Sequence, residues 1–181
     1  MTNGIPEREI KAKTWLLFVY CFNGINPADI ASLTWDRVKE TYFWFIREKT
    51  KRTTKKKPIQ IKPQFTPTNK PYFTKYARKK EDNNYMFPIL EKGMSTEAIK
   101  KAVHAFDSQI CRVGARIAKE LGFTKKLTPY VMRHTFATVS NKKGVNQLTT
   151  SRNLGHQDFK ATQIYMGLAD DIELQEAAAL L

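Results

Sequence analysis

The sequence has few cysteines and lacks the motifs that usually mark nucleotide-binding and zinc-binding proteins. Its two cysteines, Cys21 and Cys111, lie in apolar helical patterns, so we expect reduced core residues and no disulfide framework. Neither a glycine-rich phosphate loop nor a Cys/His spacing for zinc occurs in the 181 residues. We therefore expect no cofactor and no bound metal.

A long hydrophobic run is also missing. The most apolar stretch, residues 14–22, is far shorter than the roughly 20 residues that cross a bilayer. The Asn-Gly-Ile-Asn-Pro sequence that follows it is not a signal-peptide cleavage site. Although Lys11 and Lys13 precede the stretch, it fits a buried helix better than a targeting signal. We expect no association with membranes.

Acidic residues are scarce relative to basic ones. The chain has 17 Asp and Glu but 31 Lys and Arg, which gives a formal net charge of +14 at pH 7. This excess predicts a polyanionic partner, first of all a nucleic acid, although a basic ribosomal or membrane-surface protein would have a similar composition. At this length we expect one domain with a sizeable core.

Capping residues and apolar spacing predict the first helices. One should span residues 6–22 and end at Asn23-Gly24, and a second should follow from Asn26, as its cap, to about residue 33. A basic helix is expected within residues 68–80. Ser95 or Thr96 should cap the longest helix, which ends at Gly122. Its apolar stripe is expected to be core and consists of Ile99, Val103, Phe106, Ile110, Val113, Ile117 and Leu121.

Three short stretches are typical of strands. Residues 42–47 are rich in aromatic side chains and residues 58–62 alternate between apolar and polar, so we expect a hairpin joined by the lysine-rich residues 49–57. Residues 85–87 are a candidate third strand.

The last third of the chain contains the candidate chemistry. Thr128 is a good N-cap and Pro129 a good first residue for a helix over residues 129–141, with Met132, Phe136 and Val139 on one face. Arg133 lies near the start of this helix. Backbone N–H groups at a helix N-terminus and a guanidinium together make a good phosphate site.

This region resembles the tyrosine recombinase (phage integrase) family. The matching residues are Arg133-His134-Thr135-Phe136-Ala137-Thr138, Leu154-Gly155-His156 and Tyr165. The resemblance implies an α+β fold, mainly helical, with a small three-stranded antiparallel sheet. It identifies residues 1–181 as the catalytic domain, without the amino-terminal DNA-binding domain of full-length relatives, and residues 169–181 as a tail that could dock on a neighbouring subunit.

The resemblance also implies the site residues. Tyr165 would be the nucleophile that forms a 3′-phosphotyrosine, Arg133 would hold the scissile phosphate, and His156 would donate to it. His134 would be structural. Lys49 matches the family's general acid best, with Lys51 as the fallback. Basic residues of the hairpin and of residues 75–80 would contact DNA, namely Lys51, Arg52, Lys55, Lys56, Lys57, Lys75, Arg78, Lys79 and Lys80.

Two positions depart from the family pattern. Asn26 stands where the family has the first of two phosphate-binding arginines, and Tyr130 stands where it usually has a histidine. Loss of one such contact typically costs about 3 kcal/mol of barrier. Either another cation compensates, with Arg47 a candidate, or cleavage is slow or absent.

The resemblance implies a site-specific recombinase of a phage or mobile element, cutting and rejoining DNA without metal or ATP. It would act on double-stranded DNA in the cytoplasm of a prokaryotic host, as a monomer alone and as a tetramer on DNA. Two alternatives remain. One is a catalytically impaired DNA-binding module, and the other is a type IB topoisomerase, against which the short acidic and apolar tail argues.

Overall fold

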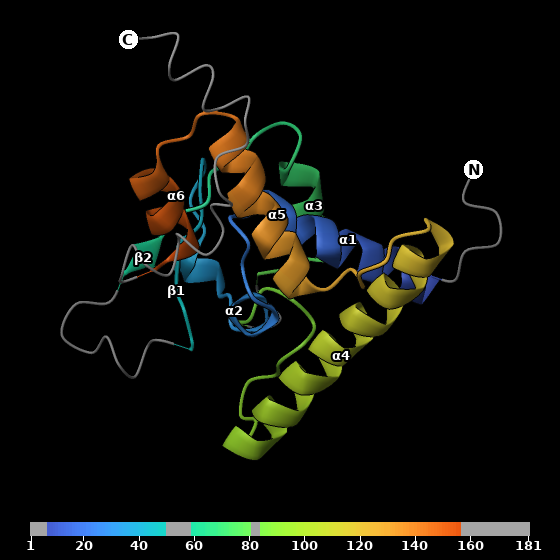
Figure 1. The fold of residues 1–181 in the computed structure, drawn as a ribbon. Coiled ribbons are helices and arrows are strands. Elements are labelled where there is room, and N and C mark those ends of the chain that lie inside the picture. The colour runs from blue at the N-terminus through green and yellow to red at the C-terminus, as the bar shows by residue number, and fades with distance from the viewer. Residues whose placement is uncertain (1–6, 50–58, 81–83, 157–181) are drawn as a thin grey trace, which may run out of the picture.

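The structure of the chain, a computed structural model, describes residues 7–49, 59–80 and 84–156 (Figure 1). The candidate nucleophile Tyr165 and the tail 169–181 lie outside these residues. So do five of the basic residues assigned to the hairpin, namely Lys51, Arg52, Lys55, Lys56 and Lys57. The predictions made for them remain predictions.

The described part of the chain is mainly helical and has one small antiparallel sheet, as expected for this fold class. In chain order the elements are α1 (Glu7–Cys21), α2 (Pro27–Ala31), a 3₁₀ turn η1 (Trp35–Arg37), β1 (Phe45–Ile46), β2 (Gln60–Ile61), α3 (Lys70–Thr74), α4 (Thr96–Glu120), α5 (Pro129–Lys142) and α6 (Gln147–Leu154).

Helix α1 forms the centre of the core and packs against both α4 and α5. The apolar residues 14–22 are buried as predicted, apart from Leu17, Tyr20 and Cys21. Aromatic rings surround this helix, and Phe18 lies 4.5 Å from Phe22 and 5.5 Å from Phe87 between ring centroids. No helix in the described ranges is both long and apolar enough to span a membrane.

The two cysteines are less buried than predicted. Cys21 and Cys111 are free and half-buried. Cys21 lies at the end of α1, and Cys111 lies on α4 beside Asp107, on the edge of the core rather than within it. Apolar spacing therefore assigned them to the right helices, and Cys21 packs against the core from its edge.

Within the described residues the sheet has two strands, where three were predicted. Phe45 pairs with Ile61 and Ile46 with Gln60. The ladder is short because Pro63, which has no N–H group, cannot extend it as a donor. The expected third strand at residues 85–87 is wrong: Tyr85 forms only an isolated bridge with Thr34. Met86 and Phe87 are buried in the core, and this burial, rather than pairing in a strand, explains why residues 85–87 are apolar.

Helix α3 lies within residues 68–80, where a basic helix was predicted, and occupies only the first part of that range. It contains five residues and buries Phe73 against the core. Beyond it, the backbone N–H of Arg78 donates to the carbonyl of Met86 at 2.8 Å instead of continuing the helical pattern. The following lysines offer no apolar face that would hold a longer helix to the core.

Helix α4 begins where the sequence predicted. The hydroxyl of Ser95 accepts from the backbone N–H of Ala98 at 3.2 Å, and Gly122 follows the helix end with a φ of +73°. The middle of the predicted stripe is buried, but Leu121 is 62% exposed. The amino-terminal half of α4 runs beyond the other helices (Figure 1), so Ile99 and Val103 are only half-buried.

Candidate active site

The start of α5 forms as its sequence predicts. The hydroxyl of Thr128 accepts from the backbone N–H of Val131 at 3.2 Å, and Pro129 is the first helical residue. The fully buried residues of this helix are Pro129, Arg133 and Ala137, whereas Met132, Phe136 and Val139, which share one face, are half-buried. A charged residue thus lies in the middle of the buried face of this helix.

Arg133 is 3% exposed and joins three segments that are distant in sequence. Its Nη1 donates to the carbonyl of Gly24 at 2.7 Å, in the turn between α1 and α2. Its Nη2 donates to the carbonyl of Leu154 at the end of α6, and lies 3.3 Å from Nε2 of His156. These contacts fix the plane of the guanidinium, which is the requirement for bidentate binding of a phosphate.

Gly24 allows this close approach. Its φ is +63°, and a Cβ at this position would lie 2.6 Å from Cγ of Arg133. The preceding Asn23 also has a positive φ, of 58°. The Asn-Gly pair that was predicted to end the first helix therefore also turns the Gly24 carbonyl toward Arg133.

His156 is positioned by the end of α6. Gly155 adopts a left-handed conformation with a φ of 66°, and the backbone N–H of His156 donates to the carbonyl of Ser151 at 3.1 Å. Burial lowers the pKa of His156 to about 4, with further contributions from the charges of Arg133 and Arg47. The imidazole is therefore neutral at pH 7. Because the Arg133 side chain has only donors, Nε2 must accept, which places the proton on Nδ1.

The small sheet packs directly on this loop. A Cβ on Gly155 would collide with Ile61 on β2 and would lie 3.0 Å from Cδ of Arg47, which follows β1. Only a glycine fits here, both for its conformation and for its lack of a side chain. Arg47, a weaker candidate from the sequence, is thereby placed beside His156.

Asp29 is a site residue that the sequence analysis missed. It is 2% exposed, and its Oδ1 accepts from the backbone N–H of Glu48 at 2.8 Å. Burial raises the pKa of Asp29, although the Glu48 N–H and the charge of Arg47 oppose this effect. Its only sequence signal was its place as an acid in the first turn of α2, which local helix rules explain fully.

Asn26 and Tyr130 line a common cavity of about 940 Å³ between α2, α4 and α5. Asn26 precedes α2 but its side chain makes no capping hydrogen bond, contrary to prediction. Tyr130 is 63% exposed, and its ring lies edge-on to that of His134 at 4.2 Å between centroids. Also lining the cavity are Glu48 and, from α4, Ile99, Lys100, Val103, His104, Asp107 and Cys111.

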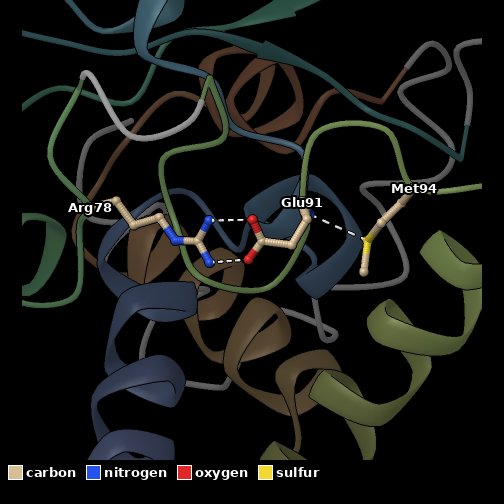
Figure 2. A network of polar contacts seen from close by, with 3 residues as sticks. All are labelled: Arg78, Glu91 and Met94. Carbon is tan, nitrogen blue, oxygen red and sulfur yellow. Dashed lines mark hydrogen bonds and ion pairs between the residues drawn. The ribbon is translucent and has the colours of Figure 1, made fainter.

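The basic residues predicted to bind DNA fall into two groups. Lys75, Lys79 and Lys80 are exposed, as is Lys49 in the turn after β1. Arg78 instead forms a two-pronged ion pair with Glu91, in which Nη1 lies 2.8 Å from Oε2 and Nη2 contacts Oε1 (Figure 2). Glu91 is itself oriented by its backbone N–H, which contacts the Met94 sulfur at 3.3 Å. This pairing argues against a role for Arg78 in DNA binding.

The chain belongs to the phage integrase family, whose model matches residues 5–171. It is 44% identical over 66 residues to the tyrosine recombinase XerA of Saccharolobus solfataricus, and the aligned segment covers 36% of this chain and 22% of that protein. It is 26% identical over 166 residues to a tyrosine recombinase of Thermosipho africanus, which covers 91% of this chain and 52% of that protein. The chain thus spans only part of the curated relatives it matches.

Solved recombinase structures have the same fold. A crystal structure of XerA recombinase matches with a TM-score of 0.61 and 22% identity, covering 99% of this chain and 65% of that one. The Tn1549 transposon integrase in complex with a circular intermediate DNA also has a TM-score of 0.61, at 16% identity, covering 95% of this chain and 59% of that one. At these identities the similarity establishes the fold alone.

Proposed function

We propose that this chain is the catalytic domain of a site-specific DNA recombinase that cleaves and rejoins DNA through a 3′-phosphotyrosine, without metal or ATP. The observation that carries the proposal is the contact between Arg133 and His156, two signature residues of the family, on a guanidinium held by the carbonyls of Gly24 and Leu154. Relatives with this fold include recombinases solved in complex with DNA.

The proposed reaction needs only side chains of this chain. The Tyr165 hydroxyl releases its proton to solvent and its oxygen attacks the phosphorus. The bond to the 5′ oxygen breaks, and the leaving oxygen takes a proton from Lys49. Arg133 and His156 stabilise the charge that develops on the non-bridging oxygens. A 5′ hydroxyl then gives its proton to the neutral Lys49 and attacks the phosphotyrosine. The phosphodiester is restored, the bond from phosphorus to Tyr165 breaks, and the released phenolate takes up a proton from solvent. Since the ester conserves the bond energy, rejoining needs no ATP.

A phosphate in this site would change the protonation of His156. In the free chain Nε2 accepts from Arg133 and the imidazole is neutral. A bound phosphate would take over the guanidinium donors and favour a protonated imidazole, because an anion beside it raises its pKa. His156 would then donate to the phosphate.

The proposed partners follow from the same reading. The net charge of +14 suits double-stranded DNA. We propose a monomer in isolation and a tetramer on two DNA sites, with the tail 169–181 docked on a neighbouring subunit. Action on a phage or mobile element in the cytoplasm of a prokaryotic host is part of this proposal.

A catalytically impaired DNA-binding module is the second candidate. It is favoured by the neutral Asn26 at the edge of the cavity and by Tyr130 at the usual position of a histidine. A type IB topoisomerase would share the chemistry but would need no subunit contact through the tail. The enzyme and the impaired module are distinguished by covalent attachment to DNA.

The test uses nicked duplexes with a randomised core, in which loss of a short fragment after cleavage prevents rejoining. The chain is incubated with this pool at low salt, adducts are separated on a denaturing gel, and their DNA is sequenced to define a preferred site. We expect an adduct with the wild type and none with Tyr165→Phe, which should bind DNA equally well because only the attacking oxygen is lost. If the wild type forms no adduct, the recombinase proposal fails and the catalytically impaired DNA-binding module is the better explanation. If Tyr165→Phe forms an adduct, Tyr165 is not the nucleophile.

A further inference from the structure

The site lacks a positive charge at the amino-terminal end of α2. Asn26 is neutral and lies half-buried at the cavity, while the signature arginine, Arg133, donates to the carbonyl of Gly24, two residues before Asn26. A pentacoordinate phosphorane carries more negative charge than the phosphodiester from which it forms. A second cation close to Arg133 and His156 would therefore lower the barrier.

Arg47 is placed to supply this charge from the sheet. It follows β1 directly, and its Cδ packs against Gly155, where an added Cβ would be only 3.0 Å away. Gly155 is covalently joined to His156, whose Nε2 lies 3.3 Å from Arg133. The aliphatic part of Arg47 thus packs on the backbone of the loop that carries one of the two signature residues.

The surroundings of Arg47 hold it in this place. Oδ1 of the buried Asp29 accepts from the backbone N–H of Glu48, the next residue, at 2.8 Å. Asp29 is on α2, three residues after Asn26, so this bond connects the end of β1 to the helix that lacks the charge. The charge of Arg47 also contributes to lowering the pKa of both His156 and Asp29.

We infer that Arg47 provides, from the end of β1, the second phosphate-neutralising charge that Asn26 does not, and that it binds a non-bridging oxygen of the scissile phosphate together with Arg133. The inference rests on the proposed cleavage reaction. It assigns Asp29 a positioning role, since its bond to Glu48 fixes the backbone beside Arg47.

Lys100 is the competing cation. It lines the same cavity as Asn26, from the amino-terminal half of α4. However, Lys100 is exposed on the part of α4 that extends beyond the other helices, whereas Arg47 is half-buried against the His156 loop. A charge held in a partly buried site stabilises a transition state more than an exposed and mobile one does.

The experiment compares Arg47→Gln, Lys100→Gln and the control Arg116→Gln, an exposed arginine on α4, on the nicked duplex that the wild type attacks. We expect Arg47→Gln to slow adduct formation at saturating protein about 10²- to 10³-fold with DNA binding retained, the usual loss for one such donor. The other two variants should cleave at nearly the wild-type rate. If Lys100→Gln has the large defect instead, the cation comes from α4 and the inference is wrong.

Two further arms separate phosphate neutralisation from a structural role. A methylphosphonate at the scissile position removes one negative charge, so the defect of Arg47→Gln should become small on this substrate. Adding Asn26→Arg to Arg47→Gln should restore cleavage, while Asn26→Arg alone should give no acceleration. Asn26→Arg alone also tests the inference if Arg47→Gln fails to fold, since a large acceleration would show that the charge was missing.

The outcomes also distinguish this inference from the proposed function. If the wild type forms no adduct, the recombinase proposal itself fails. If the wild type forms an adduct and Arg47→Gln is as fast, or is not rescued by either arm, only the assignment of Arg47 fails.

Discussion

The carbonyl oxygen of Gly24 accepts a hydrogen bond of 2.7 Å from Nη1 of Arg133, 109 residues further along the chain. This bond anchors the central arginine of the site to the turn after α1 rather than to its own helix. The turn that replaces a family arginine with Asn26 thus still positions the second arginine. Residues 24–26 therefore do two things: Gly24 positions Arg133 for phosphate binding, and Asn26 leaves the site without the charge of the first family arginine.

Gly24→Ala should therefore reduce both stability and cleavage. An alanine here would adopt a left-handed conformation, at a cost of about 1–2 kcal/mol, and its Cβ would press on Arg133, 2.6 Å from Cγ. The displaced guanidinium would lose its alignment with His156. We expect a loss of unfolding free energy greater than the conformational cost alone, and a much larger fractional loss of adduct formation than of DNA binding.

Gly93→Ala is the matched control for this variant. Gly93 has a φ of +86°, and nothing lies within 4 Å of an added Cβ. It should lose about 1–2 kcal/mol of unfolding free energy from conformation alone and keep normal cleavage per folded molecule. Equal effects of the two substitutions on stability and cleavage would show that Arg133 does not depend on the space at Gly24.

His156 should make stability depend on pH. Its pKa in the folded chain is about 4, whereas an unfolded histidine titrates near 6.5. Between these values the unfolded chain binds more protons, so the contribution of His156 to the free energy of unfolding increases as pH rises from about 4 to 6.5 and is constant above. His156→Gln should remove this contribution in denaturant titrations across pH.

The measurement compares the wild type with His156→Gln, so that every other histidine is retained in both proteins. His134, whose pKa is also lowered by burial and by Arg133, therefore cancels from the difference. A wild-type profile in His156→Gln would mean that the imidazole is not desolvated as the structure indicates.

Lys49→Ala should be rescued by a substrate whose leaving 5′ oxygen is replaced by sulfur. A thiolate leaves without a proton, so loss of the general acid no longer matters. Lys49 is exposed in the turn after β1, two residues beyond Arg47. Rescue is measured as the ratio of adduct formation on the sulfur and oxygen substrates. If Lys51→Ala shows the rescue and Lys49→Ala does not, the general acid lies two residues along.

DNA binding should depend on Lys79 but little on Arg78. Lys79 is exposed, and loss of one phosphate contact should reduce the slope of log K against log salt by about 0.9. Both Nη atoms of Arg78 contact Glu91 (Figure 2), so Arg78→Ala should leave the slope nearly unchanged. An equal fall in slope for both variants, in titrations between low and moderate salt, would place Arg78 on the DNA.

Local sequence signals predicted much of this fold. The cap at Thr128, the cap at Ser95 and the helix end at Gly122 depend only on neighbouring residues, and all three formed as expected. Residues 85–87 failed as a strand because burial, not pairing, explains their apolar side chains. Motif order was enough to select Arg133 and His156 as candidates, and the structure places them in contact.

The remaining features of the site depend on contacts between distant segments. The buried guanidinium of Arg133 donates to the carbonyls of Gly24 and Leu154, which lie 109 and 21 positions away in the sequence. The bond from Glu48 to Asp29 joins a strand end to a helix, and nothing in either local sequence predicts it. Likewise, the sequence around Arg78 predicts an exposed cation, and only the fold places Glu91, 13 residues later, in an ion pair with it.

Removing the tail from Ile172 onward should spare DNA binding and impair assembly. The tail contains four acids, Asp170, Asp171, Glu173 and Glu176, which phosphate would repel, and its apolar residues are Ile172, Leu174, Ala177, Ala178, Leu180 and Leu181. A helix of about ten residues is marginal in water, so it needs a groove in which to dock. We propose that a neighbouring subunit provides this groove. In an isolated monomer we expect the tail to fold back on its own domain or to fray.

The measurement mixes two duplexes of the captured site that carry different fluorophores, and follows their joint assembly with the full chain or with the truncated one. We expect equal affinity for a single duplex but loss of the two-duplex complex on truncation. A quadruple variant, Asp170→Asn, Asp171→Asn, Glu173→Gln and Glu176→Gln, keeps the apolar residues and should still assemble, because docking is attributed to the apolar face. Normal assembly by the truncated chain would contradict docking of the tail on a neighbouring subunit.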